Sequence, residues 1–288
     1  MANKLRDLVA PGSLASVMSA QNPLSARLAE LAGFDGVWAS GFELSAAYGV
    51  PDASLLSLTQ HLDMTRAIAE RVSVPVIADL DTGYGNAVNV MHVVGAYARA
   101  GAAAVVIADK TFPKDTSLLA GGRQDLVRVE EFQGKIAAAR AAGSGQGLLI
   151  VARTEALIAD LGLDEALRRA QAYSEAGAEM ILVHSKQKTP DEIVAFTRRW
   201  RGSTRLVVVP TAYPDLTEAK IRELGNIGIV IYGNHAVRAA VTAMRQVFAA
   251  IRADGGIHNV DKRIASVEEI FELQRVAEMK SIEQQYLR

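Results

Sequence analysis

The chain alternates between short runs of apolar, often β-branched residues and longer stretches in which apolar residues recur with a helical period. Short apolar runs predict strands, and the longer periodic stretches predict helices that bury one face. This alternation continues along nearly the whole sequence. It predicts eight strands, at Leu14–Ala20, Gly36–Ser40, Pro75–Asp81, Ala103–Asp109, Leu148–Glu155, Glu179–Ser185, Arg205–Thr211 and Ile227–Asn234.

Helices are predicted between these strands, and several of them end at a glycine that precedes the next strand. The predicted helices are Pro23–Ala32, Leu58–Arg71, Ala87–Ala100, Val129–Ala141, Leu163–Ala176, Pro190–Trp200, Thr217–Leu224 and Ala236–Ala253, with capping glycines at Gly33, Gly101, Gly177 and Gly225. The strands are apolar on both faces, as a parallel sheet covered by helices requires. Eight such units without a linker predict a single α/β domain over residues 1–288, a closed (β/α)8 TIM barrel. An open, doubly wound sheet is the alternative.

Two segments depart from this regular pattern. Residues 109–128 form a long polar connection after the fourth strand, and loops of this length in compact domains are usually lids or binding loops. Residues 266–288 have helical spacing beyond the eighth unit. Because the barrel leaves this helix nothing to pack on, we expect it to bind a neighbouring subunit, so the protein is predicted to be an oligomer.

The composition excludes several kinds of partner and chemistry. Lys and Arg number 31 against 32 Asp and Glu, so no bulk positive field favours nucleic acid or anionic lipid. The chain has no cysteine, which excludes disulfides, thiolate metal sites and a cysteine nucleophile. No apolar run approaches the roughly 20 residues of a membrane span, and the start of the chain does not resemble a signal peptide. We therefore expect a soluble, cytoplasmic protein with no nucleic-acid or membrane partner.

Asp79 and Asp81 follow the apolar run of the third predicted strand and precede two glycines. In a strand, side chains two residues apart point the same way, so these carboxylates are expected to lie together at the strand's carboxyl end. Paired carboxylates suit Mg2+ or Mn2+, which bind through a few oxygens plus substrate and water. The alternative is a pair of ordinary turn or helix-capping aspartates.

Polar residues, this pair among them, fall at the carboxyl ends of the predicted strands, where (β/α)8 barrels carry their chemistry. The set comprises Ser40, Asp79, Asp81, Asp109, Arg153, Glu155, His184, Ser185, Thr211 and Asn234. Together they suit a small anionic substrate with carboxylate and carbonyl oxygens. Arg153 can bind a carboxylate through two parallel hydrogen bonds. A cation and the backbone amides at Ser40-Gly41 can hold an enolate as negative charge develops.

The motifs along the chain resemble those of the phosphoenolpyruvate mutase/isocitrate lyase superfamily, over nearly the whole length. The motifs are Trp38-Ala39-Ser40-Gly41, Gly49-Val50-Pro51-Asp52, Asp79-Leu80-Asp81-Thr82-Gly83-Tyr84-Gly85-Asn86, Asp109-Lys110-Thr111-Phe112-Pro113-Lys114, Val151-Ala152-Arg153 and Val183-His184-Ser185. The resemblance implies a small 2-oxo acid substrate and a Mg2+ cofactor, which Mn2+ or Co2+ could replace. It also implies a homodimer or homotetramer in which C-terminal helices are exchanged between paired subunits.

The resemblance also implies roles for individual residues. Asp79 would ligate Mg2+ directly, and Asp81 and Asp52 would reach the ion through water. Trp38, Ser40, Gly41 and Arg153 would bind the substrate's pyruvyl and other oxygens. Lys114, Thr116 and His184 would surround a phosphoryl group, and the loop around Lys114 would close over the substrate.

Within the superfamily, the sequence Lys114-Asp115-Thr116-Ser117 is similar to that of members that hydrolyse the carbon–phosphorus bond of 3-phosphonopyruvate. In that reaction Thr116 could be the nucleophile with His184 as its base, or these residues could orient a water. A phosphoenolpyruvate mutase-like, oxaloacetate hydrolase or 2-alkylmalate lyase activity is an alternative. Ala108 stands where the superfamily has a glutamate, which predicts weaker metal binding and leaves open a weakly active or inactive 2-oxo acid binding barrel.

Overall fold

A computed structural model describes residues 1–287 of the chain. The chain divides into two compact units, of which the first is Met1–Ala236 and the second begins at Val237. The first unit contains all eight strands and the candidate site. The arrangement predicted from the sequence, one domain over residues 1–288 with an oligomerisation helix at residues 266–288, stays a prediction.

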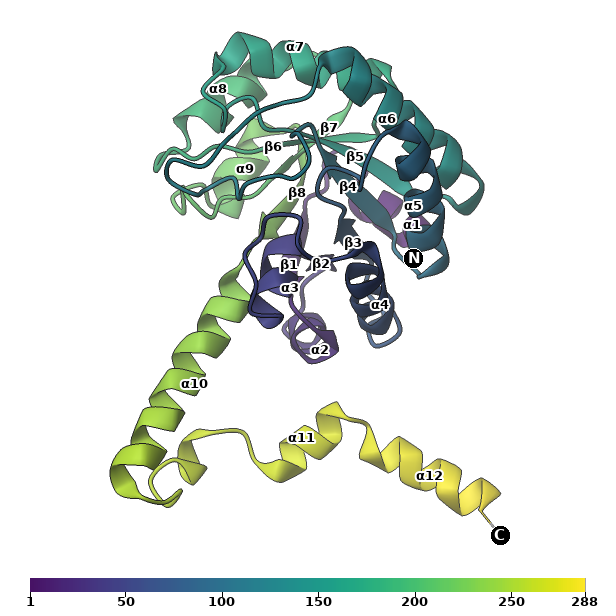
Figure 1. The fold of residues 1–288 in the computed structure, drawn as a ribbon. Coiled ribbons are helices and arrows are strands. Elements are labelled where there is room, and N and C mark those ends of the chain that lie inside the picture. Colours follow the sequence, from purple (N-terminus) through teal and green to yellow (C-terminus); the bar gives the residue numbers. More distant parts are fainter. Residues whose placement is uncertain (288) are drawn as a thin grey trace. The chain divides into compact units, whose positions relative to one another are not determined.

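The strands of the first unit close into a barrel in the order in which they occur in the sequence (Figure 1). They are β1 (Ala15–Ala20), β2 (Gly36–Ala39), β3 (Val76–Asp79), β4 (Ala104–Ala108), β5 (Leu149–Thr154), β6 (Met180–Val183), β7 (Arg205–Val208) and β8 (Ile227–Tyr232). All neighbours are parallel, and β1 pairs with β8. The closed barrel is confirmed, and the open-sheet alternative is wrong.

Helices follow the strands and surround the barrel (Figure 1). In the first unit they are α1 (Ala2–Leu8), α2 (Pro23–Leu31), α3 (Gly41–Ala47), α4 (Leu58–Ala69), α5 (Ala87–Arg99), α6 (Val129–Gly143), α7 (Gly162–Glu175), α8 (Asp191–Arg199) and α9 (Glu218–Leu224), with a short 3-10 helix at Ser144–Gln146. Every predicted helix of this unit is present. The sequence pattern did not predict α1 or α3, each of only seven residues.

The barrel interior is filled by alternate residues of the strands. Val17, Ile77, Val106 and Val151 belong to one buried cluster, while their neighbours along the strands pack against the surrounding helices. Leu5 of α1 is 1% exposed and joins the interior cluster. The amino-terminal helix therefore contributes to the core inside the barrel.

Glycines end several helices as the sequence pattern predicted. Gly33 and Gly225 follow α2 and α9 with φ angles of 88° and 79°, in the left-handed region that a residue with a Cβ adopts at a cost. The chain can therefore turn directly from each helix into the next strand.

In the described part of the second unit, residues 237–287, lie three α-helices, of which the first, α10 (His235–Asp254), begins two residues before the unit does. Beyond it lie a 3-10 helix at Asp261–Arg263, α11 (Val267–Leu273) and α12 (Val276–Tyr286). The predicted C-terminal helical segment, residues 266–288, consists of two helices within its described residues 266–287, and residue 288 lies outside them. Arg275 lies between α11 and α12 in the left-handed conformation, with φ 58° and ψ 42°, and this conformation interrupts the helix.

Candidate active site

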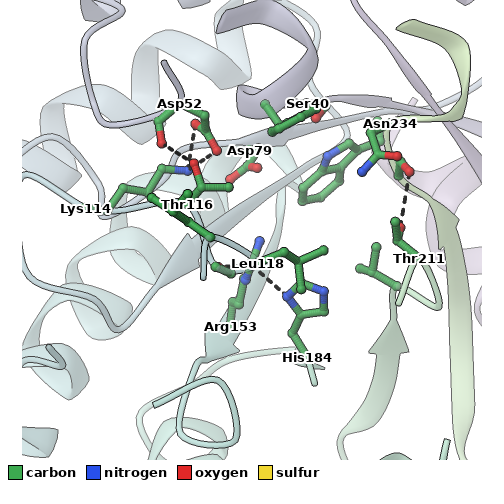
Figure 2. Close-up of a pocket in the computed structure, with 16 residues that line it drawn as sticks. Ser40, Asp52, Asp79, Lys114, Thr116, Leu118, Arg153, His184, Thr211 and Asn234 are labelled. Atoms are coloured by element: carbon green, nitrogen blue, oxygen red, sulfur yellow. Dashed lines mark hydrogen bonds and ion pairs between the residues drawn. The ribbon is translucent and has the colours of Figure 1, made fainter. Parts of the chain in front are cut away.

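A cavity of about 380 Å3 opens at the carboxyl ends of the strands in the first unit (Figure 2). Most of the predicted site residues line it, namely Trp38, Ser40, Asp52, Asp79, Lys114, Thr116, Arg153 and His184, together with Thr211 and Asn234 from the last two strand ends. Residues far apart in the sequence are thus brought to one end of the barrel, where barrels of this kind carry their chemistry.

Of the predicted polar residues at strand ends, Asp81 does not line the cavity, and three others lie behind it. Asp109 is fully buried, and its carboxylate accepts hydrogen bonds from Tyr173 Oη at 2.7 Å and Arg169 Nη1 at 3.2 Å. Glu155 is fully buried behind Arg153, and Ser185 Oγ donates to Glu192 Oε2 at 2.5 Å. Asp109, Glu155 and Ser185 are thus bonded to other buried side chains and do not line the cavity.

Asp79, Asp81 and Asp52 bring three carboxylates together beside Gly41. A Cβ placed on Gly41 would lie 3.0 Å from Asp81 Oδ1, 3.5 Å from Asp79 Oδ2 and 3.7 Å from Asp52 Oδ1. Any larger residue at position 41 would therefore enter the space among these oxygens. Within residues 1–287, no three His, Asp or Glu side chains form a ready set of direct metal ligands.

Asp81 reaches this cluster by a route that the sequence pattern did not predict. β3 ends at Asp79, and Asp81 lies in a turn with φ 51°, so the strand alternation invoked for the pair is wrong. Gly83 N donates to Leu80 O at 2.8 Å, and Ala108 N donates to Asp81 O at 2.7 Å. A tight turn fixed to the end of β4 therefore places the second carboxylate.

The Lys114 ammonium meets the negative charge of this cluster (Figure 2). Its Nζ lies 3.0 Å from Asp52 Oδ1 and also contacts Asp81 Oδ1. Burial on its own would lower the pKa of Lys114, but Asp81 and Asp52 outweigh it and the net shift is upward. Burial raises the pKa of Asp52, an effect that Lys114 opposes. The amine is therefore a permanent cation on the loop that follows β4.

Arg153 and His184 form a second polar group in the same cavity (Figure 2). Arg153 Nη2 donates to His184 Nδ1 at 3.0 Å, and its Nε contacts Glu155 Oε1. Because Nδ1 accepts this hydrogen bond, the proton of the neutral imidazole lies on Nε2. Burial, with a further contribution from Arg153, lowers the pKa of His184 to about 3, so the ring is neutral near pH 7.

The tautomer changes how His184 can act. Its Nε2 is buried and has no hydrogen-bond partner within the described residues 1–287. It is therefore a donor available to a bound oxygen. The hypothesis that His184 is the base for Thr116 receives no support from this arrangement, since a protonated Nε2 has no lone pair to accept a proton.

Thr116 lies on the loop 109–128, whose two ends pair with each other. Thr111 N donates to Asp125 O at 3.0 Å and Val127 N to Asp109 O at 2.9 Å, which closes the base of the loop. At the tip, Thr116 Oγ1 donates to Asp52 O at 2.9 Å. The loop is thus docked over the carboxylate cluster, as the prediction of a functional loop requires.

Lys110 and Ser117 also contact residues of the site, although the sequence pattern predicted no role for either. Lys110 is 2% exposed and lies beside Glu155, and Ser117 Oγ accepts from Arg153 Nη2 at 3.0 Å. In the sequence, the position of Lys110 two residues after Ala108, at the end of an apolar strand, could have indicated a role for this residue.

Comparison with known proteins identifies the family of this chain. The sequence profile of phosphoenolpyruvate phosphomutase matches residues 5–252, and the chain belongs to that family. It is 62% identical to phosphonopyruvate hydrolase of Variovorax sp. (strain Pal2) over 99% of this chain and 98% of that protein. It is 40% identical to phosphoenolpyruvate phosphomutase of Tetrahymena pyriformis over 99% of this chain and 94% of that protein.

The fold comparison agrees with the sequence comparison. A crystal structure of phosphonopyruvate hydrolase in complex with oxalate and Mg2+ superposes with a TM-score of 0.95. That match has 60% sequence identity and covers 100% of this chain and 99% of the other. The resemblance to this superfamily inferred from the motifs is confirmed.

No helix within residues 1–287 combines the length and the apolar composition needed to cross a lipid bilayer.

Proposed function

We propose that this protein hydrolyses 3-phosphonopyruvate to pyruvate and phosphate. The carbon–phosphorus bond breaks and a phosphorus–oxygen bond forms. Water supplies the fourth oxygen of the phosphate and the proton that the pyruvate enolate takes up. The observation that carries the proposal is that one cavity of about 380 Å3 holds Asp79 and Asp52 of the carboxylate cluster together with Arg153 and the neutral His184. The 62% identity to a phosphonopyruvate hydrolase supports the same substrate.

The carboxylate cluster is proposed to hold Mg2+. Asp79 is assigned as the direct ligand, with Asp81 and Asp52 contributing through water. The space that a Cβ of Gly41 would fill, bounded by one oxygen of each carboxylate, fits this role. When bound, the ion supplies positive charge that stabilises the enolate oxygens of the leaving group. Mn2+ or Co2+ is proposed to substitute, since an oxygen-only site accepts such ions.

The cavity residues are proposed to bind the two ends of the substrate. Ser40 and Gly41, beside the carboxylates, bind the pyruvyl oxygens with help from Trp38. Arg153 and His184 Nε2–H donate to substrate oxygens, and both donors are already fixed by the hydrogen bond between them. Pre-positioned donors of this kind stabilise developing charge without reorganising during the reaction.

Lys114 and Thr116 are assigned to the phosphoryl group. Both lie on the docked loop, and Thr116 Oγ1 is held by Asp52 O at 2.9 Å. Two routes are open: attack by Thr116 Oγ1 followed by hydrolysis of a phosphothreonine, or attack by a water that Thr116 orients.

Replacement of Thr116 tests this assignment. Thr116→Ala is expected to release phosphate at least about 100-fold more slowly than the unsubstituted protein, because it loses the proposed nucleophile or its orienting group. Thr116→Val, which keeps the shape of the side chain, is the matched control for packing and should be equally slow. Phosphate release by either variant at the unsubstituted rate would remove Thr116 from the chemistry.

The quaternary structure is proposed to be a dimer or tetramer of this chain that exchanges the C-terminal helices. The support is apolar surface on the second unit, where Phe248, Phe271, Ile282 and Tyr286 are each about half exposed or more. Side chains of this size gathered on one short unit need a partner surface to leave water.

A further inference from the structure

Lys110 is a buried lysine that the proposed chemistry does not use. It follows β4 by two residues, and its side chain is 2% exposed and does not line the cavity. An amine in such a place is unfavourable unless it is paired and hydrogen-bonded. Burial lowers the pKa of Lys110 to about 8, although Glu155 opposes this shift. The contacts of its ammonium therefore indicate what the residue does.

The ammonium of Lys110 binds both residues that flank Thr116. Its Nζ donates to the backbone carbonyl of Asp115 at 2.7 Å and to Ser117 Oγ at 3.0 Å. It also lies 3.7 Å from Glu155 Oε2, which keeps a counter-charge beside it. A single buried group thus fixes the loop immediately before and immediately after Thr116.

Other contacts of Thr116 come from the loop itself or from another loop. Its carbonyl accepts from Leu119 N at 3.1 Å and from Gln124 Nε2 at 3.2 Å, and these partners move with the loop. Its hydroxyl donates to the carbonyl of Asp52, which belongs to the connection after α3. Lys110 stands at the base of the same loop, two residues after the end of β4 and paired there with Leu126, so it ties the tip of the loop to this base.

Ser117 connects this anchor to the substrate site. Its Oγ lies 3.0 Å from Lys110 Nζ and 3.0 Å from Arg153 Nη2, so the two cations share one acceptor. Arg153 is also the residue assigned to substrate oxygens. A shift of Ser117 would therefore change the positions of both Thr116 and Arg153.

We propose that Lys110 is a positioning residue that holds Asp115 and Ser117 so that Thr116 is presented to the substrate. The role of Thr116 rests on the proposed function, whereas the anchoring of the loop does not. Lys110 touches no substrate in this proposal and acts through the loop alone.

The test replaces Lys110 by Met, which keeps the length of the side chain and removes the donors. Lys186→Met is the control, because Lys186 also holds a backbone carbonyl, that of Ile158 at 2.9 Å, but belongs to a different loop. For each protein, kcat, KM and the rate of trypsin cleavage after Arg123 are measured. Arg123 is on the 109–128 loop and its side chain is 56% exposed, so cleavage there reports opening of the loop.

For Lys110→Met we expect kcat to fall about 100-fold, with KM changed much less, because a misplaced group costs rate more than affinity. Cleavage after Arg123 should be about tenfold faster, as expected when an opening equilibrium loses one charged hydrogen bond. Lys186→Met should match the unsubstituted protein in all three measurements.

The proposal is overturned if Lys110→Met keeps kcat within about threefold and is cleaved at the unsubstituted rate. If Lys110→Met does not fold, Ser117→Ala tests the same anchor, and the same two outcomes decide it. If the unsubstituted protein releases no phosphate, the proposed function fails, and equal cleavage of all variants would then overturn the anchor as well.

Discussion

Replacing Glu155 by Gln tests how much the buried charges behind the cavity stabilise the fold. Glu155 is fully buried, and its carboxylate lies between Arg153 and Lys110. Burial on its own would raise the pKa of Glu155, but the two cations outweigh it and lower the pKa to about 2. The fall from the usual 4.5 to about 2, at about 1.36 kcal/mol for each pH unit, corresponds to roughly 3 kcal/mol of stability at pH 7.

The sign follows from which state binds the proton more tightly. Because the pKa is lower in the folded protein, the stabilisation is fully present above pH 4.5 and is lost as the pH falls toward 2. At pH 3, roughly half of it should remain. Glu155→Gln lacks the titrating group, so its deficit in the free energy of unfolding should shrink to roughly half between pH 7 and pH 3.

The assay is urea unfolding of both proteins at pH 7 and pH 3, followed by circular dichroism. Asp63→Asn is the control, since it breaks an exposed pair with Arg66 and should cost less than about 1 kcal/mol at either pH. A deficit for Glu155→Gln below about 1 kcal/mol at pH 7, or one that does not change with pH, would refute the reasoning.

Two further predictions concern the metal and the assembly. Ala108→Glu should bind Mg2+ about 10-fold to 100-fold more tightly, because Ala108 ends β4 beside the Asp81 turn and a carboxylate there could hold a water bound to the ion. Equal affinities in a calorimetric titration with oxalate present would contradict this. Phe271→Glu should shift the protein toward monomers in light scattering, because Phe271 is 49% exposed on α11, whereas Gln274→Glu, which adds the same charge at a polar position, should not. A monomeric unsubstituted protein, or unchanged assembly of Phe271→Glu, would argue against the exchanged-helix oligomer.

The barrel could be predicted from the sequence because its signal is local and repeated. Apolar runs with a helix between each pair define the units, and glycines such as Gly33 and Gly225 mark where helices end. The ends of the strands were less well predicted. β3 stops at Asp79 because the next residues enter a turn stabilised by Gly83 and Ala108, and no period in the sequence encodes that turn.

The composition of the candidate site was predictable, but its internal pairing was not. Residue types at strand ends indicated which side chains could meet. The tautomer of His184 depends on the hydrogen bond from Arg153, which comes from a different strand. The role of Lys110 depends on a loop that returns to it from Asp115 and Ser117. Contacts of this kind are set by tertiary structure and leave no periodic signal.

The most direct test of the central claim is the conversion of 3-phosphonopyruvate by the purified protein with Mg2+. Pyruvate and phosphate should appear in equal amounts, and removal of the metal by a chelator should stop their release until Mg2+ is restored. The account is contradicted if phosphoenolpyruvate forms in place of phosphate, or if no phosphate is released while oxaloacetate or a 2-alkylmalate is cleaved.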